Sequence, residues 1–136
     1  MAEPIRALDV PARTTTIYPA PYAATVAGRA KRALGDLFGL SQFGVNLTVL
    51  APGSSSAERH WHETEDEFVF ILEGEAVLID DQGEHVLGVG MCAVLRPAFP
   101  TPTSSSIVRQ RPSPSSRSAH GARVTAPIIP RLTCWR

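Results

Sequence analysis

The clearest structural signal in the chain is the segment Glu67 to Glu73, which has the pattern of a strand with two apolar faces. In an extended chain successive side chains point to opposite faces, so Phe68, Phe70 and Leu72 share one face and Val69 and Ile71 the other. A strand that is apolar on both faces is typical of one buried within a folded domain. The segment therefore predicts a sheet protein.

Several short strands and turns surround this segment. Phe43 to Leu50 alternates roughly between apolar and polar residues, and Ala51 to Ser56 has turn chemistry. Ala76 to Ile79 predicts another strand, Asp80 to Gly83 a hairpin turn, and Glu84 to Leu87 the returning strand. Short strands separated by turns every eight to twelve residues indicate an all-β barrel or sandwich.

The N-terminal 42 residues carry a weaker pattern, and we treat residues 1–42 as an N-terminal extension. Val26 to Leu40 predicts a short helix, although its glycines disfavour one. We interpret Arg29, Lys31 and Arg32 as a solvated face rather than a phosphate site.

The length of 136 residues fits one domain with a modest core. No apolar run approaches the roughly 18 residues of a membrane span, and the start of the chain lacks the pattern of a secretion signal. We therefore expect a soluble, cytoplasmic protein without a membrane partner. Cys92 and Cys134 are too few to indicate a disulfide framework, so we expect both to be thiols.

The net charge of zero conceals an uneven distribution. Residues 1–93 hold all 13 acidic residues against 6 basic ones, a net of 6 − 13 = −7, whereas residues 94–136 hold 7 arginines and no acid, a net of +7. The second segment also has 7 serines and 7 prolines and no periodicity, which is typical of low-complexity or disordered chain. Scattered arginines with no lysine and few aromatic residues are a poor match to a nucleic-acid-binding surface, so we expect no nucleic-acid partner.

His60 and His62 are the strongest candidates for a chemical function. Two histidines that are two residues apart on a strand face the same side, with Trp61 on the other side. Glu67 on the following strand can complete a three-ligand set for a divalent transition metal. The alternative is an exposed polar edge without a metal.

These residues also resemble a known motif. Gly53, His60, His62, Glu67 and Gly74 are similar to the first conserved motif of the cupin superfamily, Gly-x(5)-His-x-His-x(3,4)-Glu-x(6)-Gly, with one extra residue after Gly53. The resemblance covers residues 43–93, which we assign as the cupin core, and it is greatest to small single-domain bacterial cupins. It implies an all-β double-stranded β-helix (jelly roll), with His60, His62 and Glu67 as metal ligands and Gly74 in a tight turn.

The second cupin motif, approximately Gly-x(5)-Pro-x-Gly-x(2)-His-x(3)-Asn, is not recognisable. Gly90 fits its first position, but His120 has neither the Pro-x-Gly before it nor an Asn after it, and we do not assign it to the metal. We therefore expect an incomplete or disordered C-terminal part, since a Pro- and Ser-rich segment is a poor source of closing strands. Residues 94–136 are interpreted either as a low-complexity basic tail or as the product of a shifted reading frame.

The resemblance implies a metal-binding protein that acts on, or only binds, a small molecule inside the barrel, with its function impaired by the missing second motif. An enzyme would be a dioxygenase, an isomerase or a decarboxylase, and the alternative is a non-catalytic sensor of a small ligand. The metal would be Fe, Mn, Ni or Zn. No catalytic acid or base is assigned, and a homodimer is an open alternative to a monomer.

Overall fold

The structure of the protein is a computed structural model that describes residues 4–57, 65–96, 107–110 and 122–130. Two short 3₁₀ turns, Ala7–Asp9 and Tyr22–Ala24, precede the regular elements. In chain order these elements are β1 (Arg29–Ala33), α1 (Leu34–Leu37), β2 (Gly44–Leu50), β3 (Glu65–Glu73), β4 (Ala76–Asp80), β5 (Gly83–Leu87), β6 (Cys92–Leu95), β7 (Ile107–Gln110) and β8 (Ala122–Pro130).

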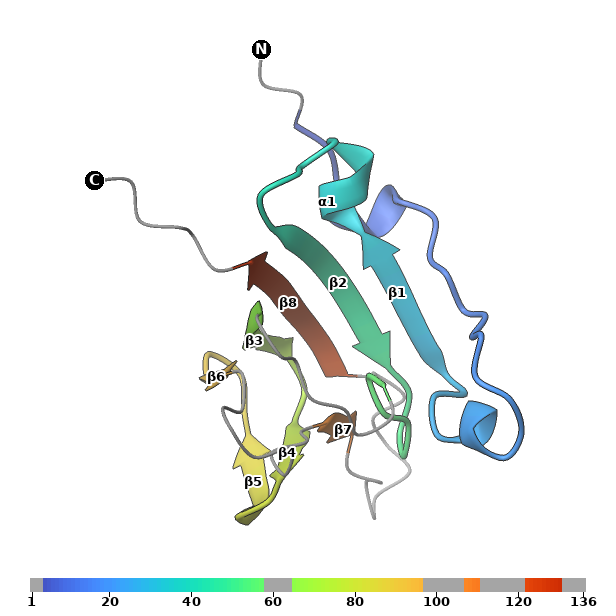
Figure 1. Cartoon of the computed structure of the whole chain (residues 1–136), viewed down its shortest axis with the longest axis vertical. Coiled ribbons are helices and arrows are strands. Elements are labelled where there is room, and N and C mark those ends of the chain that lie inside the picture. The colour runs from blue at the N-terminus through green and yellow to red at the C-terminus, as the bar shows by residue number, and fades with distance from the viewer. Residues whose placement is uncertain (1–3, 58–64, 97–106, 111–121, 131–136) are drawn as a thin grey trace.

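The strands form two antiparallel sheets. The larger has the order β1-β2-β8-β3-β6, and the smaller has the order β5-β4-β7. Figure 1 shows the long strands β1, β2 and β8 side by side, with the smaller sheet across the lower part of the molecule and α1 at the opposite end. Between the described residues every strand pairing is antiparallel, which confirms the predicted all-β class.

The strand predictions for residues 43–50 and 67–87 are confirmed with small changes of boundary, whereas the strand expected to hold His60 and His62 lies outside the described residues. β2 begins at Gly44, β3 begins two residues before Glu67, and β4 and β5 form the predicted hairpin in the register Ala76↔Leu87 to Asp80↔Gly83. The two faces of β3 differ in burial, however. Ile71 is fully buried, whereas Leu72 on the other face is 46% exposed.

The predicted helix over Val26 to Leu40 is wrong for most of its length. Residues Arg29–Ala33 form β1 and pair with β2 along their whole length, and only Leu34–Leu37 are helical. The ladder with β2 satisfies the backbone groups that a helix would otherwise bond internally. Gly35 lets α1 approach this strand, because a Cβ atom there would stand 2.8 Å from the backbone nitrogen of Val45.

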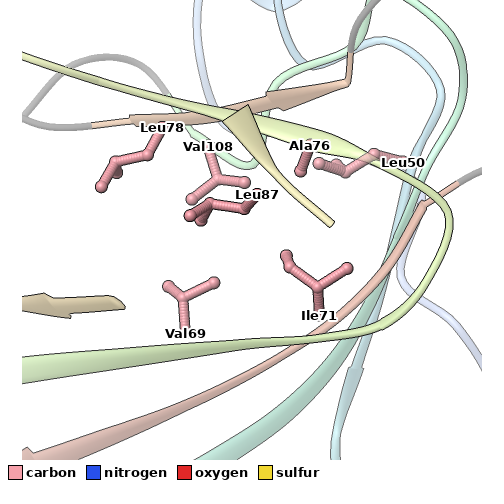
Figure 2. Close-up of a cluster of buried hydrophobic side chains, with 7 residues drawn as sticks. All are labelled: Leu50, Val69, Ile71, Ala76, Leu78, Leu87 and Val108. Atoms are coloured by element: carbon pink, nitrogen blue, oxygen red, sulfur yellow. The ribbon is translucent and has the colours of Figure 1, made fainter. Parts of the chain in front are cut away.

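The hydrophobic core lies between the two sheets. Figure 2 shows Val69 and Ile71 of β3 pointing toward side chains from the other strands. The seven buried members of the cluster are Leu50, Val69, Ile71, Ala76, Leu78, Leu87 and Val108. Because residues at i, i+2 and i+4 share one face of a strand, this core identifies the inner face of β3 as the face that also carries Glu67.

The C-terminal segment contributes two strands, although its composition makes it a poor source of them. β7 pairs with β4, and β8 lies between β2 and β3 in the larger sheet (Figure 1). This segment has no regular alternation of apolar and polar residues, so the pairing depends on the neighbouring strands rather than on a local pattern. Pro127 lies opposite Val45 in this ladder, where proline has no N–H to donate.

In the part of the chain that the structure describes, no helix has the length and apolar content that crossing a membrane requires.

Candidate ligand and metal site

Glu67 is the predicted metal ligand that the structure describes, and it lies on the inner face of the larger sheet. Its neighbours across the ladders are Leu95 of β6 and Ile128 of β8. Its side chain is half-buried, two residues before the core residue Val69. The carboxylate is therefore directed toward the space between the sheets, as a ligand inside the barrel would be.

His60 and His62 lie outside the described residues, so the three-residue ligand set remains a prediction. Among the residues that are described, no three His, Cys, Asp or Glu side chains stand together closely enough to hold a metal ion. Gly74 is described, and its φ of 77° in the turn between β3 and β4 fits the tight turn that the motif implies.

A cleft of about 580 Å³ lies at the other edge of the larger sheet, between residues 10–13, β1, α1 and β2. Its polar lining consists of Arg13, Lys31, Asp36 and Asn46. The sequence prediction missed this site because its residues come from four separate segments.

The register places the cleft on the same face of the sheet as the core. Leu50 belongs to the core, so Asn46 and Thr48 share its face of β2. Lys31 pairs with Thr48 and therefore has its side chain on that face. The inner face of the larger sheet thus carries Lys31 and Asn46 on β1 and β2, and Glu67 on β3.

Arg13 is held beside Lys31 by the backbone. The N–H of Arg13 donates to the carbonyl of Lys31 at 2.8 Å, and the N–H of Lys31 donates back to the carbonyl of Arg13 at 3.0 Å. This reciprocal pair makes the two residues directly opposite each other, with their side chains on one face. The two cations consequently enter the same cleft.

Lys31 was expected on a solvated face, but its side chain is half-buried. Burial is the main cause that lowers the pKa of its ammonium group, and the positive charges of Arg29 and Arg13 lower this pKa further. Asp36 and Glu67 act in the opposite direction. Both cations and carboxylates among the described residues thus act on the charge of Lys31, and Glu67 is one of the carboxylates.

Arg29 and Arg32 are each bound to a backbone carbonyl. The guanidinium of Arg29 donates to Ser56 at 2.6 Å, and that of Arg32 donates to Val10 at 2.8 Å. Both have structural partners, which distinguishes them from Lys31. His85 is exposed on the β4–β5 hairpin. Cys92 is a free, exposed thiol, as expected.

Comparison with known proteins agrees with this architecture. Residues 46–100 match the family model described as "Cupin domain". The chain is similar to a sugar phosphate isomerase from a cupin superfamily, from Silicibacter pomeroyi, which is known from a crystal structure. The two sequences are 36% identical, and the structures match with a TM-score of 0.78, over 94% of this chain and 76% of that chain. The chain therefore belongs to the cupin superfamily, and the predicted family is confirmed.

Two further solved structures share the fold at lower identity. The polyketide cyclase RemF from Streptomyces resistomycificus is 17% identical with a TM-score of 0.71, over 100% of this chain and 89% of that chain. The Cupin_2 domain of an XRE family transcriptional regulator from Enterobacter cloacae is 20% identical with a TM-score of 0.57, over 76% of this chain and 99% of that chain. Among curated protein sequences, none matches significantly.

Proposed function

We propose that the protein binds a divalent transition metal through His60, His62 and Glu67, and a small molecule next to it between the two sheets. The observation that carries this proposal is the position of Glu67. Its half-buried carboxylate lies on the inner face of β3, on the strand that follows the two histidines in the sequence. Imidazole nitrogen together with carboxylate oxygen suits Fe, Mn, Ni or Zn.

The chemistry of the site would be divided between the metal and the wall of the barrel. A bound metal supplies a Lewis acid with positions open to a ligand. Val69 and Ile71, on the same face as Glu67, are buried in the core and would form an apolar boundary on one side of the ligand. With three assigned protein ligands rather than four, we propose that the metal is bound more weakly than in a complete site.

Isomerisation of a sugar phosphate is the first reaction to test, because the relative at 36% identity is described as a sugar phosphate isomerase. Dioxygenase and decarboxylase chemistry are the other reactions that a metal at this position supports. Ligand sensing without catalysis is the alternative. A panel of small molecules assayed with Fe(II) or Mn(II) separates the two, because saturable binding without turnover identifies a sensor.

The metal ligands are tested by elemental analysis of the purified protein. We expect stoichiometric metal in the wild type and its loss in His60→Ala and His62→Ala. His85→Ala is the matched control, since this exposed histidine lies on the hairpin and should leave the metal content unchanged. Unchanged metal in the His60→Ala/His62→Ala double variant would rule out the proposed ligands.

We also propose a cytoplasmic protein whose partner is a small molecule rather than a nucleic acid. The sparse arginines of residues 94–136 support this choice. A nucleic-acid-binding protein would instead show an affinity that falls steeply with salt and disappears when residues 94–136 are removed. Sedimentation of the same sample distinguishes a monomer from a homodimer.

A further inference from the structure

We propose that Arg13, Lys31 and Asn46 form a binding subsite for an oxyanion, either a phosphate or a carboxylate group of the ligand. The inference rests on the proposed small-molecule function and names the chemical class of that ligand. The subsite lies outside the metal-binding motif, in the cleft between residues 10–13, β1 and β2.

The backbone fixes the two cations side by side. Arg13 and Lys31 are joined by both hydrogen bonds of an antiparallel pair, at 2.8 and 3.0 Å, so their side chains start from neighbouring positions on one face. Asn46 lies on the adjacent strand two residues from Thr48, the partner of Lys31. Its amide adds a neutral donor beside the two charged ones.

Cations outnumber acids among the described residues that line the cleft. Asp36 is the acidic residue in the lining, against two cations. Between described residues, the structure gives neither Arg13 nor Lys31 an ion pair with a carboxylate. A half-buried ammonium group with a lowered pKa gains most from an anion that enters the cleft, because the anion compensates the cost of its burial.

The geometry also connects the subsite with the proposed metal position. Lys31 and Glu67 lie on the same inner face of the larger sheet, and the charge of Glu67 acts on Lys31. A ligand on this face can therefore place an anionic group at the cleft while another part of it approaches Glu67. Arg29 and Arg32 are already bound to carbonyl groups, whereas Arg13 and Lys31 line the cleft, so these two are the described cations that we assign to the ligand.

The test is calorimetric titration of the full-length protein with inorganic phosphate and, separately, with acetate, at constant ionic strength to hold screening fixed. We expect at least one of the two anions to bind. Tighter binding of phosphate assigns a phosphate group to the ligand, and tighter binding of acetate assigns a carboxylate. Failure of both anions to bind the wild type overturns the proposal.

The variants are Arg13→Gln and Lys31→Gln, singly and together. Loss of one charge-assisted donor should weaken anion binding about tenfold. Lys31→Arg keeps the charge and should retain binding. Arg109→Gln is the matched control, because it removes one exposed arginine from the smaller sheet and should leave the affinity unchanged. Thermal unfolding of each variant verifies that it is folded.

An unchanged anion affinity in the folded double variant overturns the proposal. Arg13 and Lys31 would then be solvated side chains without a role in ligand binding. Repeating the titration with His60→Ala/His62→Ala separates this result from the metal hypothesis. Anion binding that persists in that variant supports the subsite independently of metal. Anion binding that disappears there, while the Arg13 and Lys31 variants retain it, assigns the anion to the metal instead and also overturns the subsite.

Discussion

Asp80 and His85 face each other across the β4–β5 hairpin, with 3.2 Å between Oδ1 of Asp80 and Nε2 of His85. The same carboxylate oxygen accepts the backbone N–H of Gln82 at 2.8 Å and that of Gly83 at 3.1 Å. The carboxylate of Asp80 therefore accepts hydrogen bonds from the turn N–H groups that would otherwise bind water. Through His85 it also connects the turn with the returning strand.

Asp80→Ala should lower the free energy of unfolding by about 1 kcal/mol at neutral pH, because the turn N–H groups lose their acceptor. The hydrogen bond from Gln82, followed by the interaction with His85, lowers the pKa of Asp80 below its ordinary value of 3.8, although its slight burial opposes this. A carboxyl whose folded pKa is depressed stabilises the fold above its unfolded pKa, and it loses this effect as pH falls through the folded pKa.

Urea unfolding of wild type and Asp80→Ala between pH 7 and pH 3 checks this prediction. The stability difference should shrink as pH falls below about pH 4, because Asp80 then becomes protonated in the folded protein. Glu84→Ala, which removes an exposed carboxylate from the same hairpin, is the control and should show a much smaller difference. A difference for Asp80→Ala that does not change with pH would contradict the role of the charge.

Ile71→Ala should destabilise the protein by about 2–5 kcal/mol, because Ile71 is fully buried in the core between the sheets (Figure 2). Leu72→Ala is the matched control, since Leu72 is the next residue and is 46% exposed. It should cost about 1 kcal/mol or less. Chemical denaturation measures both, and equal losses would mean that the two faces of β3 are buried alike.

Gly28→Ala should destabilise the protein more than Gly53→Ala, although both glycines have a positive φ, of 86° and 82°. The backbone penalty of about 1–2 kcal/mol is common to the two. At Gly28 a Cβ atom would also stand 2.6 Å from Oγ of Ser54 and 2.8 Å from Cβ of Ala51, whereas at Gly53 no atom lies within 4 Å.

The additional cost at Gly28 should be about 1 kcal/mol or more, since the buried Ser54 hydroxyl donates to the carbonyl of Ala27 and cannot move freely. Thermal unfolding of the two variants measures the difference. Equal melting temperatures would show that the loop between β2 and β3 adjusts to the added methyl group.

Metal occupancy should fall as pH drops through the imidazole range near about 6.5, because neutral imidazole is the form that binds metal. Elemental analysis after gel filtration at pH 8 and at about pH 5 checks this expectation. Metal retained in full at the lower pH would indicate a site that does not use His60 and His62.

The sequence predicted the parts of the fold whose evidence is local. The apolar run of β3 and the turn after Asp80 depend on residues close together in the chain, and the structure confirms the strand and the hairpin. Residues 29–33 were assigned to a helix because the partner that makes them a strand, β2, is separated from them by α1 and a loop. Strand formation depends on such pairing more than on intrinsic preference.

The same limit applies to the candidate site. The spacing of the motif identified Glu67, which the structure places on the inner face. Lys31 was interpreted as solvated, because its burial depends on Arg13 from the N-terminal segment and Thr48 from β2. The proposed anion subsite was therefore not predictable from the sequence, because no single segment shows how residues 10–13, β1 and β2 pair with one another.

The reading frame of residues 94–136 provides the last prediction. No acidic residue follows Glu84, and the match to the second motif stops after Gly90. In addition, β8 carries Pro127 at a central position of the larger sheet, where it has no N–H to donate. One shift of the reading frame explains these features together, whereas a genuine low-complexity tail requires a separate reason for each.

The genetic code makes the shift testable at named codons. In the frame that starts at the third base of each codon, the junctions from Leu95 to Ala98 permit Pro-Ala-Gly, and the junction of Phe99 and Pro100 must encode Ser or Pro. The junction of Pro102 and Thr103 permits His, and that of Ser106 and Ile107 permits Asn, which gives the His-x(3)-Asn of the missing motif. We expect the gene to encode these residues in that frame. An early stop codon there, or the lack of a His codon across Pro102 and Thr103, would leave the basic tail as the natural end of the domain.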